Sequence, residues 1–208
     1  MGWYADQVVP RAIDLLMRDK ETGRVRSRVA ASLDGEVLEI GFGSGLNVPH
    51  YPARITRVLA VDPATVGRKL AARRTAASPV PVDFIGLDAQ RLPVADGSVD
   101  HVLRTWTLCT ISDVEQALAE IGRVLRPGGS LHFAEHGLAP DPKVASRQHR
   151  LTPLQRRVAG GCHLDRPIDK LIAGSGLAFE RLETSYMQGL KAWCYTFEGS
   201  AVKDGARP

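Results

Sequence analysis

Three closely spaced glycines indicate a turn that holds a ligand. Gly41, Gly43 and Gly45 lie in the stretch VLEIGFGSG, which begins as a buried strand. Glycine allows a tight turn from strand to helix and a close approach of the backbone to a ligand. The dinucleotide fingerprint G-x-G-x-x-G needs a third glycine at position 46, where this chain has Leu46. We therefore expect a nucleoside-bearing cofactor other than NAD.

Two carboxylates accompany the glycine turn. Glu39 comes just before Gly41, where its charge is unfavourable for a phosphate and favourable for a cationic amino group. S-adenosylmethionine has such a group and carries no pyrophosphate. Asp62 ends the next apolar run, in LAVDPA, where a carboxylate can accept hydrogen bonds from both ribose hydroxyls. Alternatively Asp62 caps the following helix, with Pro63 at its first position, and the two roles are compatible.

A third acidic residue follows the third apolar run. The segment GLDAQRLP spans residues 86–93. In a loop at the carboxyl edge of a sheet, Asp88 and the backbone of Ala89 can contact an adenine. Aspartate is common in loops, so this assignment depends on its place in order after the glycine turn and Asp62.

The elements that position these residues alternate between strands and helices. Apolar runs at about 36–41, 57–61, 82–87, 99–105 and 130–135 are typical of strands buried on both faces of a parallel sheet. SDVEQALAEIGRVL has helical periodicity, with Ser112 and Glu115 as a capping box and RPGG as its end. We expect a short helix at 167–173 and two antiparallel strands near 178–186 and 191–198. The pattern predicts an α/β fold.

We expect a single domain over residues 1–208. Its parts are an N-terminal helical cap (1–34), a cofactor-binding core (35–137), a substrate-side insertion (138–165) and a C-terminal helix and strand pair (166–200). In the cap, roughly the first 20 residues have helical spacing, a polar basic segment follows, and Trp3 and Tyr4 are candidates to close the pocket. Within the insertion, residues 143–157 hold five Lys or Arg and no Asp or Glu. This basic segment is either a solvated helix face or a lid that favours an anionic acceptor.

The motifs together resemble one enzyme family. LEIGFGSG, VDPA, GLDAQRLP, VLRTWTLCTI and RVLRPGGSL occur in this order between about residues 35 and 136. This series resembles the class I S-adenosylmethionine-dependent methyltransferases. The resemblance implies a Rossmann-like, seven-stranded, mostly parallel sheet with an antiparallel last strand and helices on both faces. It also implies S-adenosyl-L-methionine as cofactor, with Arg104 and Thr105 at the end of the fourth strand among the cofactor-binding residues.

A narrower resemblance concerns the acceptor. LCTISDVEQALAEIGRVLRPGG, EHG and GGCHLDRPI are similar to the methyltransferase-like seven group and its soluble bacterial relatives. Animal members of that group are thiol S-methyltransferases with an N-terminal membrane anchor. The resemblance implies methyl transfer to a small-molecule thiol. The alternatives are C- or O-methylation of a quinone precursor or phenol, whose enzymes share RVLRPGG, and a cofactor-binding module without turnover.

Two histidines are the candidate catalytic residues. Methyl transfer depends mainly on positioning, and a base is needed only if the acceptor arrives protonated. His136, after the fifth strand, is a candidate base or an ordinary hydrogen-bonded strand-end residue. His163, in GGCHLDRPI, is a candidate pocket residue. We expect its neighbour Cys162 to be a packed thiol, Asp165 to cap the next helix and Arg166 to lie on the surface.

Composition excludes several other classes. The chain has 208 residues, of which 44% are hydrophobic and 24% are charged, and its net charge is +4. Basic and acidic residues are mixed along most of the chain, which is not typical of a nucleic-acid-binding surface. No apolar run approaches the roughly 20 residues of a membrane span, and no signal peptide is evident. We expect a cytoplasmic protein without a stable membrane anchor or nucleic-acid partner. Cys109, Cys162 and Cys194 are too widely spaced for a CxxC site, so no disulfide or metal is expected.

Overall fold

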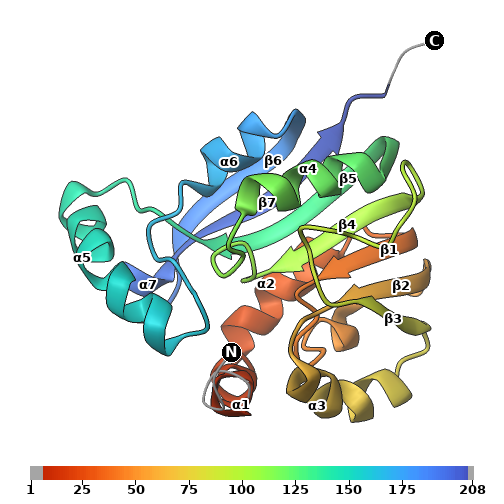
Figure 1. Ribbon diagram of the computed structural model, residues 1–208, viewed down its shortest axis with the longest axis horizontal. Helices are drawn as coiled ribbons and strands as arrows, with labels where there is room; N and C mark the ends of the chain where they lie inside the picture. Colours follow the sequence, from red (N-terminus) through yellow and green to blue (C-terminus); the bar gives the residue numbers. More distant parts are fainter. Residues whose placement is uncertain (1–6, 206–208) are drawn as a thin grey trace.

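A seven-stranded sheet forms the centre of the molecule. The computed structural model describes residues 7–205. The strand order is β3-β2-β1-β4-β5-β7-β6 (Figure 1). The first five strands run parallel, and β7 lies antiparallel between β5 and β6. The strands are β1 (Gly35–Ile40), β2 (Ile55–Val61), β3 (Val82–Gly86), β4 (Val99–Thr105), β5 (Leu125–His136), β6 (Leu177–Tyr186) and β7 (Tyr195–Lys203). The predicted fold, with its antiparallel last strand, is confirmed.

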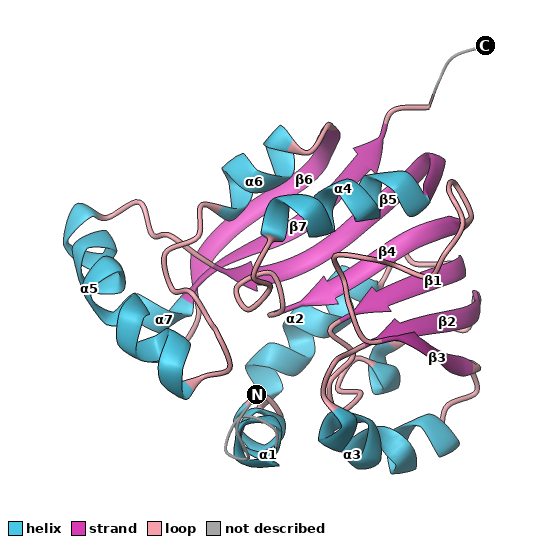
Figure 2. Ribbon diagram, in the orientation of Figure 1, coloured by secondary structure: helices cyan, strands magenta, loops and turns pink. Residues whose placement is uncertain are grey.

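Helices cover both faces of the sheet (Figure 2). They are α1 (Val9–Leu16), α2 (Lys20–Ala30), the 3₁₀ helix η2 (Val48–His50), α3 (Thr65–Ala76), α4 (Val114–Val124), α5 (Pro142–Val158), α6 (Ile168–Gly174) and α7 (Lys191–Cys194). Adjacent residues of β1 point to opposite faces. Val37 packs in one core with Val25 and Val29 of α2, whereas Leu38 packs in the other with Leu118 of α4. This burial on both sides explains the continuous apolar runs.

The polar segment after α1 is a second helix of the predicted N-terminal cap, although its own sequence has no clear helical periodicity. Asp19 caps α2, since its side chain accepts hydrogen bonds from the backbone N–H groups of Glu21 and Thr22. Val25 and Val29 supply a narrow apolar stripe that packs on the sheet. Two apolar positions among so many charges gave too weak a periodicity to predict the helix. Trp3 and Tyr4 lie outside the described residues.

The capping box predicted for α4 is wrong. The helix begins one residue later than that motif requires, and Asp113 caps it by accepting from the backbone N–H of Gln116 at 2.9 Å. Ser112 instead donates to the Gln90 side chain, which lies in the loop after β3. The helix ends at Val124, before RPGG as predicted.

The last predicted strand also needs correction. Residues 191–194 form the short helix α7, and the strand begins only at Tyr195. A hydrogen bond from the Trp193 indole to the side chain of Gln155 attaches this helix to α5. The buried aromatic residues Tyr195 and Phe197 alternate along β7 as a strand requires. In the described part of the chain, no helix is both long and apolar enough to cross a membrane.

Candidate active site

The glycine turn lies where the parallel strands end. It follows β1 directly, and Gly41, Gly43 and Gly45 all have positive φ, at 76°, 54° and 74°. A Cβ at Gly41 would collide with the side chain of Thr107, which follows β4. Only glycine therefore allows both the turn and its close packing against the neighbouring strand end.

Asp62 joins the end of β2 to the glycine turn. Its carboxylate accepts hydrogen bonds from the backbone N–H of Gly43 and from that of Ala64, both at 2.7 Å. Burial raises the pKa of this carboxyl. The alternative role predicted for it is wrong, because α3 begins at Thr65 with Ala64 as its N-cap, and Pro63 precedes the helix. Asp62 closes a turn before the helix and keeps further lone pairs for a ligand.

A fourth glycine, Gly67 in the first turn of α3, was not found from the sequence. A Cβ at this position would lie 2.9 Å from the carbonyl oxygen of Gly43. The helix therefore approaches the turn as closely as the third glycine of a dinucleotide fingerprint allows elsewhere. In the sequence, Gly67 follows VDPA and lies outside the G-x-G-x-G motif, so that motif did not reveal it.

A buried network of polar side chains holds the residues on either side of the glycine turn. Glu39 is fully buried and accepts hydrogen bonds from Asn47, at 2.9 Å, and from the hydroxyl of Tyr51. Arg26 donates to Asn47 and to Thr105, at 2.7 and 2.6 Å. Burial raises the pKa of Glu39 to about 7. Since both Glu39 oxygens have protein partners, this carboxylate orders the turn from within.

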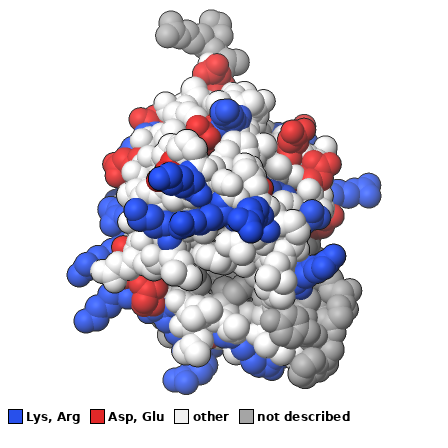
Figure 3. Space-filling view, turned by 90° about the vertical axis from the view of Figure 1, so that its left-hand side faces the viewer, with Lys and Arg blue, Asp and Glu red and all other residues white. Residues whose placement is uncertain are grey.

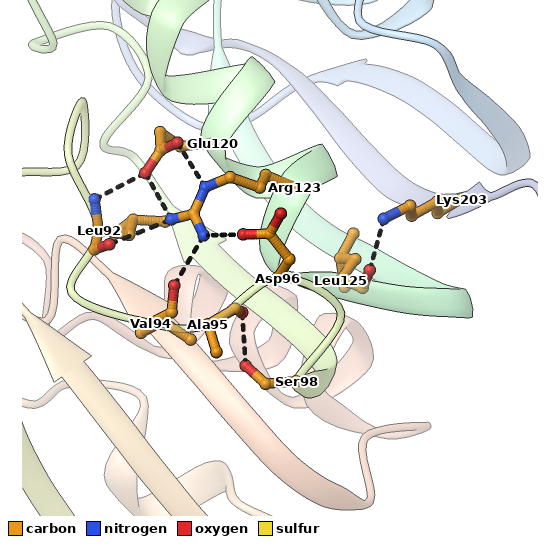
Figure 4. Close-up of polar contacts among 9 residues, drawn as sticks. All are labelled: Leu92, Val94, Ala95, Asp96, Ser98, Glu120, Arg123, Leu125 and Lys203. Atoms are coloured by element: carbon orange, nitrogen blue, oxygen red, sulfur yellow. Dashed lines mark hydrogen bonds and ion pairs between the residues drawn. The ribbon is translucent and has the colours of Figure 1, made fainter.

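Arg123 fixes the loop that carries Asp88 and Ala89. Its guanidinium pairs with Glu120 and Asp96 and donates to two backbone carbonyls of the loop, those of Leu92 and Val94 (Figure 4). Glu120 in turn accepts from the backbone N–H of Leu92. The loop is thereby attached to α4 along residues 92–96.

Within that loop, the two predicted site residues differ in exposure. Asp88 is exposed, and its carboxylate accepts from the backbone N–H of Gln90 at 2.8 Å. Ala89 is half-buried and packs against the larger core cluster. Both therefore lie in a defined loop conformation after β3.

The loop after β4 contains a strained residue. Trp106 has a φ of 52°, an unfavourable value for a bulky side chain. The buried carboxylate of Glu135 holds the next residues, accepting from the backbone N–H groups of Thr107, at 2.9 Å, and Leu108, at 3.0 Å. Strain of this kind persists where surrounding contacts impose it and is concentrated at functional sites.

Arg104 presents an unusual buried cation. Its side chain is completely buried, and none of its three guanidinium nitrogens has a hydrogen-bond partner among residues 7–205. Burial lowers its pKa to about 10, while Glu135 and Cys109 act in the opposite direction through their charges. A buried charge without hydrogen bonds is costly, so this position calls for nearby anions.

Two cysteines and a histidine meet at the ends of β4 and β5. Cys109, His136 and Cys162 each place a potential ligand atom within 4.8 Å of the others. Nε2 of His136 lies 3.2 Å from Sγ of Cys162. The Cys109 thiol and then the His136 imidazole lower the pKa of Cys162, whereas the pKa of Cys109 is raised. Sequence reasoning treated these residues separately because they are far apart in the chain.

His163 lies beside this group and not within it. Its Nδ1 is 3.0 Å from the carbonyl oxygen of Cys109, and its backbone N–H donates to the same oxygen at 2.8 Å. A carbonyl only accepts, so Nδ1 carries the proton and neutral His163 has Nε2 as its basic nitrogen.

The expectations for Asp165 and Arg166 are wrong. Asp165 pairs with His149 of α5 at 2.8 Å, and α6 has Pro167 as its N-cap. Arg166 is buried and donates to the carbonyl oxygens of Leu108 and Ile111, so it holds the loop after β4.

The basic segment 143–157 lies within α5, and its Lys and Arg side chains are on the exposed face of that helix. Its inward side buries Val144, Gln148 and Thr152. All five of its Lys and Arg residues are exposed, and Figure 3 shows a band of Lys and Arg side chains on this side of the molecule.

A hollow of about 590 Å³ lies elsewhere, between α1, α3 and η2. Arg18, Tyr51 and Arg74 are among its lining residues, but none of the site residues predicted from the sequence lines it. Those residues gather instead at the ends of the parallel strands and in the loops that follow them.

Comparison with known proteins identifies relatives of several activities. A family model described as a methyltransferase domain matches residues 38–133. The chain is 32% identical over 163 residues to the thiol S-methyltransferase TMT1A of Homo sapiens, covering 76% of this chain and 65% of that protein. It is 30% identical over 164 residues to TMT1B of Rattus norvegicus, covering 77% and 67%. It is 33% identical over 162 residues to the demethylmenaquinone methyltransferase of Thermobifida fusca, covering 74% and 64%. The chain thus spans about two thirds of the length of these relatives.

Solved structures share the fold. A phosphoethanolamine N-methyltransferase 2 of Haemonchus contortus, in complex with S-adenosylhomocysteine, superposes with a TM-score of 0.71 at 16% identity, covering 97% of this chain and 60% of that one. The YcgJ protein of Bacillus subtilis gives a TM-score of 0.69 at 16% identity, covering 89% and 99%.

Proposed function

This chain belongs to the class I S-adenosylmethionine-dependent methyltransferases, and from that membership we propose that it methylates the sulfur of a small-molecule thiol. When bound, the cofactor supplies an electrophilic methyl group on a sulfonium. The observation that carries the choice of sulfur is that the free base beside these strand ends, among the described residues, is the imidazole of His163, whereas the Glu135 carboxylate accepts backbone hydrogen bonds and Nε2 of His136 faces Cys162.

The residues at the glycine turn fit this cofactor. Asp62 is fixed at the end of β2 with lone pairs left for the ribose hydroxyls. Gly41, Gly43 and Gly45 leave the backbone of the turn open to close approach, and a Cβ at Gly43 would be in ordinary contact with the Gly41 carbonyl oxygen, at 3.9 Å. Pro63 is exposed beside Asp62. We assign the amino acid end of the cofactor to this turn.

Of the other residues assigned to the cofactor, some are proposed to contact it and others to position the glycine turn. We propose that Asp88 and the Ala89 backbone contact the adenine from the loop that Arg123 fixes. Glu39 and Thr105 act through the buried network and position the turn. Arg104 is too deeply buried to be a surface contact, and we assign it an electrostatic role.

The bases available at the site help to decide between a thiol and a phenol as the acceptor. Relatives named for thiol and for demethylmenaquinone methylation are equally similar to this chain, so identity does not discriminate. A phenol, with a pKa near 10, needs a base to ionise at neutral pH, whereas a thiol, near 8.5, needs far less help. Glu135 accepts from the backbone of the loop after β4, and His136 faces Cys162. This arrangement favours the acceptor that ionises more easily.

His163 is the better-placed candidate base of the two histidines. Its Nδ1–H donates to the Cys109 carbonyl, which leaves Nε2 to accept a proton from an incoming thiol. Nε2 of His136 instead lies 3.2 Å from Sγ of Cys162. The alternative acceptor is a quinone precursor or phenol, and a module that binds the cofactor without turnover is the non-enzymatic alternative.

The test is methyl transfer from labelled S-adenosylmethionine to a panel of alkyl and aryl thiols, phenols and a demethylated quinone. We expect turnover of thiols that is lost in Asp62→Ala and kept in Asp83→Ala, an exposed aspartate on β3. Turnover of the quinone or phenols in preference to thiols would overturn the choice of sulfur. Cofactor binding by calorimetry without any turnover would support the binding module.

A further inference from the structure

We propose that Cys109, His136 and Cys162 form a zinc site whose fourth coordination position takes the sulfur of the acceptor thiol. The metal site stands on the geometry of the three side chains, and only the identity of the fourth ligand rests on the proposed function. Two cysteines and a histidine with one open position are the pattern of a catalytic zinc centre.

The spacing of the ligand atoms suits a tetrahedral ion. Zinc binds sulfur at about 2.3 Å and imidazole nitrogen at about 2.0–2.1 Å, so tetrahedral ligands lie roughly 3.6–3.8 Å apart. The three candidate atoms lie within 4.8 Å of one another. Nε2 of His136 is 3.2 Å from Sγ of Cys162. Side-chain adjustments of about 1 Å or less would complete the geometry.

Each ligand is held by its own backbone contacts. His136 ends β5, and the backbone N–H of Gly137 donates to the Tyr195 carbonyl of β7 at 3.1 Å. Cys109 is fixed through its carbonyl, which accepts two hydrogen bonds from His163. The backbone N–H of Cys162 donates to the carbonyl of Ala159 at 3.1 Å. The Cys109 and Cys162 segments thus hold each other through His163, and the sheet holds His136, so the three ligands form a preorganised site.

The surrounding charge favours thiolates at these positions. The Arg104 guanidinium is buried without a hydrogen-bond partner in the described chain and interacts with Cys109 through its charge. Arg166 is a second buried cation that interacts with both cysteines. Both guanidinium groups favour the thiolate form of a cysteine, which is the form that binds zinc.

The site lies where an acceptor is needed. Cys109 follows β4 and His136 ends β5, at the carboxyl edge of the sheet where ligands of this fold class bind. An acceptor thiol that binds the open position gives up its proton to a base such as His163. The lone pair of its sulfur then forms the new bond to the methyl carbon, and the sulfonium–methyl bond breaks. The products are a thioether, S-adenosylhomocysteine and one proton.

Metal content tests the site directly. We expect the full chain, purified under reducing conditions, to hold about one zinc per molecule. Cys162→Ser and His136→Asn should weaken zinc binding by at least about 10-fold. Cys194→Ser is the matched control, since Cys194 is a half-buried cysteine outside the cluster. Equal zinc binding by all four proteins would overturn the proposal.

Cobalt substitution gives a readout that does not depend on the folding of variants or on turnover. We expect the unaltered chain loaded with Co²⁺ to show thiolate-to-cobalt charge transfer and the visible bands of a tetrahedral ion. Addition of an alkyl thiol should intensify the charge transfer, and the matching alcohol should not.

The outcomes separate the two proposals. Tetrahedral thiolate bands without a response to thiol would support the metal and overturn the fourth ligand. Thiol methylation at an undiminished rate by a metal-free chain would keep the proposed function and overturn the binding of the acceptor sulfur to the metal, and a chain that binds no zinc would overturn the metal site. So would a Cys109–Cys162 disulfide, found by mass spectrometry, in a chain that binds no zinc after reduction.

Discussion

The Asp62 carboxylate accepts a hydrogen bond of 2.7 Å from the backbone N–H of Gly43, and so the end of β2 fixes the turn that follows β1. One side chain therefore has two tasks, because it shapes the turn and also presents lone pairs to a ligand. Half-buried, with its pKa raised by burial, it lies in an environment where a further hydrogen bond is worth more than in water.

Replacing Asp62 should impair cofactor binding more than folding. We expect Asp62→Ala to weaken binding of S-adenosylmethionine by about 10-fold or more, because hydrogen bonds to a charged group are worth about 1.5–3 kcal/mol each. Isothermal calorimetry measures the affinity, and thermal unfolding checks the fold. Asp83→Ala on neighbouring β3 should bind as the unaltered chain does. Normal affinity in Asp62→Ala would refute the ribose assignment.

Two helical glycines offer a matched test of close packing. Gly67→Ala places a methyl group 2.9 Å from the Gly43 carbonyl oxygen, so we expect a loss of about 1–3 kcal/mol in the free energy of unfolding and weaker cofactor binding. Gly122→Ala in α4 meets nothing within 4 Å and should stabilise by up to about 1 kcal/mol. Chemical denaturation measures both. Similar stabilisation by the two substitutions would show that α3 can move away from the turn.

The sequence predicted the sheet well because its strands are buried on both faces, which leaves uninterrupted apolar runs such as that of β1. It failed where tertiary contacts decide the structure. α2 is too polar to reveal its periodicity, and α7 occupies residues whose aromatic content suggested a strand. The N-cap of α4 was misplaced because Ser112 and Asp113 are both good caps, and Ser112 bonds to Gln90 of another segment.

His163 should matter for acceptor ionisation. Asn can still donate to the Cys109 carbonyl but has no basic nitrogen, so His163→Asn should keep the loop after β4 in place. We expect thiol turnover near neutral pH to fall by about 100-fold and to recover as the pH approaches the thiol pKa. The pH profile of kcat is the readout, and His149→Asn on exposed α5 is the control. A uniform loss at every pH would mean a structural role.

Stability at mildly acidic pH should depend on His132. Burial, with the nearby charges of His101 and Arg181, lowers its pKa to about 4, although Asp34 acts in the opposite direction. Between pH 6.5 and about 4, the His132 imidazole is protonated in the unfolded chain and neutral in the folded chain. The contribution of neutral His132 to the free energy of unfolding is therefore complete above pH 6.5. It decreases by up to about 3 kcal/mol as the pH falls to about 4.

His132→Gln cannot titrate and should lose this part of the pH dependence. Denaturant unfolding at several pH values measures the free energy of unfolding as a function of pH. Between about pH 4 and 6.5, we expect the slope of this curve to be smaller by about 1.4 kcal/mol per pH unit in the variant. Parallel curves for His132→Gln and the unaltered chain would contradict the prediction.

The candidate site was predictable only where its residues follow one another in a motif. Gly41, Gly43 and Gly45 were found together, and Asp62 followed from its place at a strand end. Cys109, His136 and Cys162 could not be grouped in this way, because only the packing of β4, β5 and the loop after α5 brings them together. Arg166 was expected on the surface because nothing in its local sequence reveals the carbonyl groups that it meets.

The most direct measurement is a competition between an aromatic thiol and the phenol of the same shape, in one reaction with labelled S-adenosylmethionine. The pair differs only in the acceptor atom, so the product ratio reports the choice of sulfur without differences in fit. We expect the thioether to exceed the aryl ether by at least about 10-fold. Equal products, or a preference for the phenol, would contradict sulfur as the acceptor atom.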